Sequence, residues 1–192
     1  MSYLRPTIFG IVMLLYLWYP YTMIQEQEEI LQEGVAYRFK TRPIDPVDAF
    51  RGRYIILGYD NFELDYAEDS NEFQYGQQVY ATLAKDSAGY AYFSELLTNA
   101  PSSGDFLLTT CLNYRKGKLR FQIPENMNKY FLNESIAPEA ERLYRQFNTE
   151  RANRDSVFVY VDARILNGNV LLDKVYFKGE TVENYIRSVM PK

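Results

Sequence analysis

The chain has 192 residues, of which 47% are hydrophobic, and carries a formal net charge of −4, an acidic balance that disfavours nucleic acid as a partner. It contains no histidine, which removes the usual general base near neutral pH, the commonest metal ligand and every catalytic arrangement built on Ser–His or Cys–His. P-loop, GxGxxG, GxSxG and CxxC motifs are missing as well, so we expect neither a cofactor nor a metal site, and most hydrolase, nucleotide-binding and redox classes are excluded.

A stretch without charged side chains lies near the N-terminus, over residues 6–24. At about 1.5 Å per residue it would form a helix about 28 Å long, close to the roughly 30 Å hydrocarbon core of a bilayer. Trp18, Tyr19 and Tyr21 cluster at its end, and aromatic rings favour the membrane–water interface. We therefore predict a single-span membrane anchor at residues 1–24.

Two patterns bear on the topology of this anchor. Arg5 precedes the span and acidic residues follow it, which favours a cytoplasmic N-terminus and places the rest of the chain outside the cytoplasm, at the inner membrane. A cleaved signal peptide is the alternative, and its small-x-small site would be Gly34-Val35-Ala36, beyond a charged, helix-favouring stretch. We expect the span to stay attached.

The remainder is long enough for one domain, which we place at 35–192 after a juxtamembrane helix at 25–34 that ends at Gly34. Apolar and polar residues alternate over 35–41, as in a strand, and Pro43 and Pro46 then bracket an acidic turn. A strand is predicted over 54–62, and its three consecutive apolar residues Ile55, Ile56 and Leu57 are expected in a strand that is buried on both faces.

Three hairpins are predicted next, over 77–97, 106–123 and 157–177. The last one turns at Asn167-Gly168-Asn169, and Asn-Gly is the strongest short-range hairpin signal. A three-residue loop there would create favourable cross-strand pairs, namely Val161 with Val175, Tyr160 with Tyr176 and Asp162 with Lys174.

One amphipathic helix is predicted between the second and third hairpins, over 134–148, with Ser135 as N-cap and Pro138 in the first turn. Cys111 falls in an apolar strand and is expected to be buried. Together these elements predict an α+β, mainly β domain of about seven to nine antiparallel strands, arranged as a sandwich or partly closed barrel with one amphipathic helix, after an N-terminal transmembrane helix.

Residues 51–59 read Arg-Gly-Arg-Tyr-Ile-Ile-Leu-Gly-Tyr and follow the acidic turn. They resemble the signature of the bacterial GDYXXLXY family, whose name is its motif. The G, Y, L and Y positions of the motif are occupied by Gly52, Tyr54, Leu57 and Tyr59. Arg53 replaces the aspartate, so a role of that acidic group does not carry over to this chain.

The resemblance extends to a second block. Tyr130, Asn133 and Glu134, followed by Glu141 in the predicted helix, are similar to the family's Tyr-x-x-Asn-Glu entry to its helix, and residues 159–168 are similar to its closing strands. The family has no assigned biochemical activity. Its members look like companions of multi-span membrane proteins, which implies a membrane partner.

Asp45 and Asp48 stand three residues apart before Arg51 and admit two interpretations. They fit a paired-carboxylate or calcium site. They also fit a turn in which the carboxylates bind backbone N–H groups and Arg51 neutralises them. We favour the structural interpretation, with Gly52 allowing a sharp turn into the strand and Tyr54 packing inward.

The expected function is a non-catalytic, membrane-anchored extracytoplasmic (periplasmic) domain that binds an envelope or membrane protein. The 18 tyrosines fit sheet packing first and a protein interface second. The alternative is an enzyme, either carboxylate-dependent through Asp45 and Glu134 or a Ser/Lys hydrolase with a signal-peptidase-like β-core, in which Lys85 would activate Ser87 or Ser94. Glu134 is expected instead to serve the N-terminus of its helix.

Overall fold

The computed structural model describes residues 4–42, 54–59, 62–65, 73–115, 117–151 and 159–189. Strands predominate, and all pairings between named strands are antiparallel, so the chain has the predicted mainly β, α+β fold. The helices are α1 (Leu4–Glu33), α2 (Glu125–Asn128), α3 (Ala137–Arg151) and α4 (Val182–Val189). The strands are β1 (Val35–Arg42), β2 (Tyr54–Ile56), β3 (Gly58–Tyr59), β4 (Glu63–Asp65), β5 (Gln78–Lys85), β6 (Ala91–Leu97), β7 (Phe106–Arg115), β8 (Lys118–Phe121), β9 (Lys129–Phe131), β10 (Val159–Leu166), β11 (Asn169–Phe177) and β12 (Glu180–Thr181).

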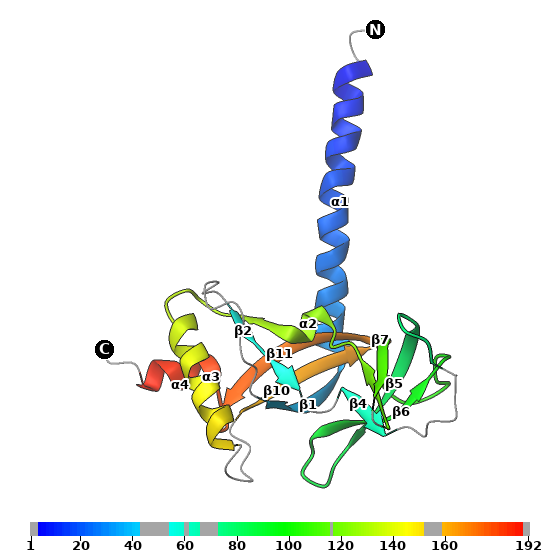
Figure 1. The fold of residues 1–192 in the computed structure, drawn as a ribbon. Helices are drawn as coiled ribbons and strands as arrows, with labels where there is room; N and C mark the ends of the chain where they lie inside the picture. The colour runs from blue at the N-terminus through cyan, green and yellow to red at the C-terminus, as the bar shows by residue number, and fades with distance from the viewer. Residues whose placement is uncertain are drawn as a thin grey trace.

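Helix α1 projects away from the domain as one continuous element (Figure 1). It is long and apolar enough to cross a membrane, and its most apolar stretch is not buried by any of the described residues. The helix runs on past Ile24, so the predicted span and the predicted juxtamembrane helix are one element.

The junction between α1 and the domain is tightly packed. The helix ends where predicted, with the Gly34 N–H bonded to the Ile30 carbonyl at 3.0 Å. A Cβ on Gly34 would collide with the Ile30 carbonyl oxygen and would lie 3.1 Å from the Arg164 Cβ and 3.2 Å from the Ile165 nitrogen, so the helix end beside β10 requires glycine. Arg164 also donates to the Gly34 carbonyl at 3.2 Å, and Ile30 is buried. These contacts fix the direction in which α1 leaves the domain.

A first five-stranded sheet has the order β12-β11-β10-β1-β3. In β1 the alternation is as predicted from Tyr37 onward, since Tyr37, Phe39 and Thr41 are buried, whereas Val35 is exposed. Strand β1 pairs along most of its length with β10, from Val35 opposite Ile165 to Lys40 opposite Tyr160. The strand that follows α1 therefore lies inside the sheet and not at its edge.

The β10–β11 hairpin confirms the three predicted cross-strand pairs, but its predicted loop length is wrong. Leu166 pairs with Asn169, so the loop has two residues, Asn167 at φ 51° and Gly168 at φ 83°, both in the left-handed region that Asn-Gly turns favour. The register then shifts by one between Asp162 and Ala163. This irregularity restores the pairs that a three-residue loop would have produced.

A second five-stranded sheet has the order β4-β8-β7-β5-β6, and it includes the first two predicted hairpins. The sheets meet where the Gly168 carbonyl accepts the Leu108 N–H at 2.8 Å. A Cβ on Gly168 would lie 2.6 Å from Phe106 Cε2, so this contact also needs glycine. Between the sheets lies a cluster of aromatic rings with centroids 4.9–6.2 Å apart, made of Phe39, Tyr59, Phe62, Phe93 and Phe121.

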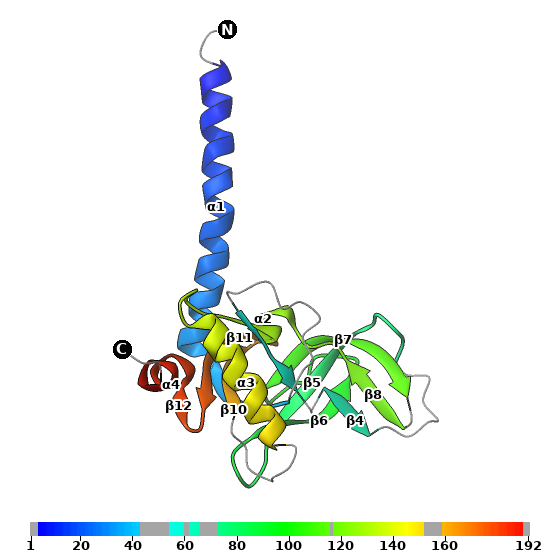
Figure 2. The ribbon, with the colours of Figure 1, turned by 60° about the vertical axis from the view of Figure 1, so that its left-hand side comes forward.

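Helices α3 and α4 cover the other end of the first sheet (Figure 2). The Phe147 ring of α3 lies 5.6 Å from Phe177 and 5.7 Å from Tyr185 of α4. Helix α4 was not predicted, and α3 begins at Ala137 instead of residue 134. The carboxamide oxygen of Asn133 accepts the Ser135 N–H at 3.0 Å, so Asn133 organises the turn before the helix that Ser135 was expected to cap.

Candidate functional site

Part of the predicted site falls in the described residues. Tyr54, Leu57 and Tyr59 are described, whereas Asp45, Asp48, Arg51, Gly52 and Arg53 lie outside the described ranges. The second block, with Tyr130, Asn133, Glu134 and Glu141, is described completely.

The predicted single strand over 54–62 changes partners at Leu57. Ile55 pairs with Tyr130 of β9, whereas Tyr59 pairs with Thr41 of β1. Between these pairings the Leu57 N–H donates to the Asn128 carbonyl at 2.9 Å, and the Leu57 side chain is completely buried. Ile55, Leu57, Gly58 and Tyr59 are buried, whereas Tyr54 and Ile56 on the other face of β2 are only partly covered. The predicted single strand forms β2 and β3 of two different sheets.

Tyr59 is the most enclosed phenol of the signature. It is 2% exposed, and its hydroxyl donates to the Met127 carbonyl at 2.8 Å. Burial raises the pKa of this phenol well above its ordinary value. Beside it, the Gly58 N–H donates to the Tyr144 hydroxyl of α3 at 3.2 Å. The signature strand is thus bonded to both α2 and α3.

The second block lies against the signature. Tyr54 and Phe131 meet edge to face at 5.6 Å, and the Tyr130 hydroxyl donates to the Glu183 carboxylate of α4 at 2.8 Å. Burial, followed by this hydrogen bond, raises the pKa of Tyr130. We name this assembly the signature junction, defined by Leu57, Tyr59, Met127, Asn128, Tyr130 and Tyr144.

The other two members of the second block have surface positions. Glu134 is exposed in the turn before α3, and Glu141 forms an ion pair with Arg145 one turn later along the helix. The Glu141–Arg145 pair lies on α3, where such pairs contribute a few tenths of a kcal/mol, whereas Glu134 precedes the first residue of the helix, Ala137, by three positions. Sequence reasoning missed Met127 and Asn128, whose contribution is a backbone carbonyl, and Glu183, for which the sequence gives no indication.

In the described residues, the side chains proposed for a Ser/Lys or carboxylate enzyme are not arranged as a catalytic site. Lys85 donates to the Ala36 carbonyl at 3.1 Å, and Ser94 pairs with Thr82 at 2.9 Å, while Ser87 is exposed in a turn. The described ranges contain no group of three or more carboxylate or thiol side chains suited to hold a metal. The partner carboxylate of Glu134 in the enzyme hypothesis, Asp45, lies outside those ranges.

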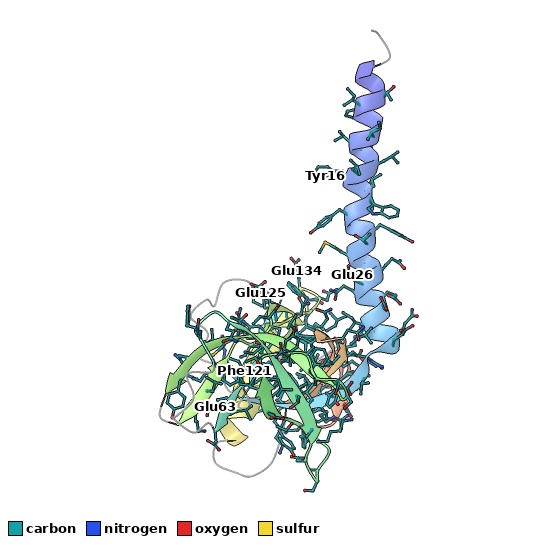
Figure 3. All side chains as sticks on the ribbon, turned by 90° about the vertical axis from the view of Figure 1, so that its right-hand side faces the viewer. Tyr16, Glu26, Glu63, Phe121, Glu125 and Glu134 are labelled. Carbon is teal, nitrogen blue, oxygen red and sulfur yellow. The ribbon has the colours of Figure 1, made fainter. Side chains whose placement is uncertain are left out.

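One surface of the domain faces the same direction as α1, which projects from it. Figure 3 shows Glu125 and Glu134 on this side, near the level of Glu26 of α1. We name it the α1-side face, defined by Glu125, Asn126, Lys129, Phe131 and Glu134. A groove of about 470 Å³ lies here between β9 and β11, and Phe131 is 70% exposed beside it. The face therefore carries two carboxylates, those of Glu125 and Glu134, together with the exposed cation of Lys129 and the exposed ring of Phe131.

A protein-family comparison matches residues 16–175 to the model described as GDYXXLXY protein. This match includes the signature junction and begins inside α1. No curated protein and no solved structure matches the chain.

Proposed function

The chain belongs to the GDYXXLXY family, and from this premise we propose that it is a non-catalytic, membrane-anchored protein whose β-rich domain lies outside the cytoplasm and binds another membrane protein. The anchor is residues 1–24, and the domain, residues 35–192, follows the junction at Gly34.

The observation that carries the proposal is the exposure of α1. Its apolar side chains, such as Phe9, Leu14 and Trp18, lie against no other part of the described structure. Burial of apolar surface is worth roughly 25 cal/mol per Å², so a helix of this length in water would be strongly unfavourable. A bilayer removes that surface from water, and Arg5 before the span supports a cytoplasmic N-terminus.

The signature junction supports a structural role for the family motif. Within it Tyr59 bonds to Met127 and Leu57 bonds to Asn128. The hydroxyls of Tyr144 and Tyr130 bond to neighbouring residues of the domain, and the apolar side chains of the junction belong to the core. A motif used in this way maintains a fold that presents a surface, and binding by such a surface needs no catalytic group. The charge of −4 and the acidic α1-side face favour a partner with basic groups near the membrane.

Topology and attachment are tested first. Spheroplasts are treated with protease, membranes are extracted with carbonate, and the intact mass of the chain is measured. We expect a carbonate-resistant chain of full mass whose domain is digested from outside. A protected domain, or a mature chain that starts near Tyr37, contradicts the proposal.

Partner binding is tested by affinity purification from detergent-solubilised membranes. The control is the same domain carried by an unrelated transmembrane helix. We expect one membrane protein to co-purify with the native chain in a fixed ratio. The absence of any such protein, with the domain folded and anchored, contradicts the partner assignment and leaves the anchor standing.

A further inference from the structure

Helix α1 stands at one side of the domain and not above its centre. Figure 2 and Figure 3, seen from different directions, both show the domain extending mainly to one side of α1. The buried Ile30 and the contact of Gly34 with β10 fix this offset. One face of α1 therefore lies directly above the domain, and the opposite face does not.

Helical geometry identifies the residues of that face. At 3.6 residues per turn, side chains 7, 11, 14 and 18 positions before Ile30 lie within about 40° of its direction. They belong to Met23, Tyr19, Tyr16 and Val12. Figure 3 shows the Tyr16 side chain pointing toward the side over which the domain extends. Leu14 and Tyr21 lie on the opposite face by the same count.

Tyr16 lies near the middle of the proposed span. It precedes Ile24 by eight residues, or about 12 Å, which is farther than its side chain reaches, so its hydroxyl stays in the hydrocarbon core. The residue is 81% exposed, and its hydroxyl has no hydrogen bond within the described residues. An unpaired hydroxyl in an apolar medium costs roughly 1–3 kcal/mol.

Pro20 adds a second polar group at the same place. A residue at this position of a helix normally donates its N–H to the carbonyl four residues earlier, and proline has none to give to the Tyr16 carbonyl. In transmembrane helices such carbonyls are satisfied by neighbouring helices or side chains. Tyr16 thus presents a hydroxyl and a freed carbonyl near the centre of the bilayer.

We propose that the face of α1 formed by Val12, Tyr16, Tyr19 and Met23, together with the α1-side face of the domain, is one docking surface for a transmembrane helix of a second protein. A polar side chain near the middle of that helix bonds to Tyr16. The inference rests on the proposed function, since it requires α1 to span the membrane.

The shape of the surface excludes a second copy of this chain. A second copy is inserted in the same direction, and its α1 continues to Glu33, about 13 Å past Ile24. Placed against the Tyr16 face, that segment and its domain would enter the volume that the first domain fills. The surface accepts a helix that ends at the membrane surface, followed by a short loop.

Charge defines this loop further. Glu26, Glu125 and Glu134 are exposed around the corner between α1 and the domain. Glu26 lies only about 3 Å past Ile24, so the corner is at the level of the lipid headgroups. The partner's extracytoplasmic loop is therefore short and carries Lys or Arg.

Site-specific photo-cross-linking in native membranes tests the surface. A photoreactive phenylalanine is placed singly at 12, 16, 19 and 23, and at the control positions 14 and 21. We expect adducts only at the first four positions, all to one other membrane protein and all within a transmembrane segment of it. Equal adducts at 14 and 21, adducts with the mass of two copies, or no adducts at any position overturn the proposal.

A paired substitution tests the hydrogen bond. Tyr16→Phe removes only the hydroxyl and should weaken co-purification of the partner about three- to tenfold, the range expected for an interhelical hydrogen bond. Tyr21→Phe is the matched control and should change nothing. Equal effects of the two substitutions overturn the role of Tyr16.

Failure of this inference is distinguishable from failure of the proposed function. If carbonate releases the chain from the membrane, both the proposed function and the docking surface are contradicted. If the chain stays in the membrane and retains its partner but gives adducts from positions 14 and 21, only the docking surface is contradicted.

Discussion

The signature junction and the exposed face of α1 use tyrosine in opposite ways. Tyr59 is 2% exposed, and its hydroxyl bonds to the Met127 carbonyl inside the domain. Tyr16 is 81% exposed, with no hydrogen bond to its hydroxyl in the described structure. Both lie within the matched family region. The meaning of a tyrosine here depends on whether its polar group is satisfied within the chain.

This difference separates two kinds of experiment. Substitutions in the junction remove internal contacts, so they change the free energy of unfolding. Substitutions on the α1 face remove groups that have no partner among the described residues, so under the docking proposal they change association and not unfolding. The free energy of unfolding is measured on the full chain in detergent micelles.

The largest effect is expected for Leu57→Ala. The Leu57 side chain is completely buried where β2 gives way to β3, so truncation leaves a cavity and should lower the free energy of unfolding by about 2–5 kcal/mol. Chemical denaturation measures it. Leu14→Ala, an equal truncation on exposed α1, is the control and should leave the domain transition unchanged; a similar loss there would erase the distinction between the regions.

Tyr59→Phe should have the next largest effect. It keeps the ring in the aromatic cluster and removes the donor to Met127, so a buried carbonyl loses its partner at a cost of about 1–3 kcal/mol. Tyr75→Phe is the matched control, since Tyr75 is 83% exposed. An unchanged denaturation midpoint for Tyr59→Phe would show that the hydroxyl is not needed.

Alkaline pH should destabilise the junction. Burial raises the pKa of Tyr59 and, together with the Glu183 hydrogen bond, that of Tyr130, above the unfolded value near 10. The stabilisation is then fully present below pH about 10 and is lost as the pH rises through the folded pKa values. Denaturation at pH about 9 and about 11 should show the fall. Tyr130→Phe should reduce it, and a stability independent of pH would contradict the assignment.

The smallest effect on unfolding is expected for Tyr16→Phe. Its hydroxyl contacts no part of the described domain, so the free energy of unfolding should change by less than about 0.5 kcal/mol. The same variant should lose partner association, as proposed above. A destabilised domain would mean that Tyr16 acts through the fold.

The sequence predicted those helices and strands that are marked by a pattern of neighbouring residues. Alternation and Asn-Gly located the β10–β11 hairpin and its pairs, yet the loop has two residues, because the register shift beyond Asp162 leaves no trace in the pattern. The apolar run over 54–62 indicated burial but not the change of partner at Leu57, which depends on the distant Asn128 carbonyl. Strands of two or three residues, such as β9 and β12, are too short for any periodicity, so the described residues contain twelve strands where about seven to nine were expected.

The candidate site shows the same limit. Tyr59 and Leu57 were singled out by a motif, but their partners are backbone carbonyls of Met127 and Asn128, which any residue supplies. Helix α4, eight residues long, follows a tight turn at Lys178 and Gly179 and offers less than three turns of pattern. In each case the feature that could not be predicted is a contact between segments that lie far apart in the chain.

The position of β1 has a consequence for biosynthesis. Its Gly34–Val35 end is held by Arg164 and Ile165, and Gly34 and Arg164 are separated by 130 positions in the sequence. At 5–20 residues per second, translation of that interval takes roughly 6 to 26 s. Throughout this time the first strand to follow α1 lacks its main neighbour in the sheet, whereas Tyr59 and Phe93, which contact Phe39 of that strand, have already been made. The first strand of the domain to be made therefore gains its β10 neighbour only after most of the chain has been translated.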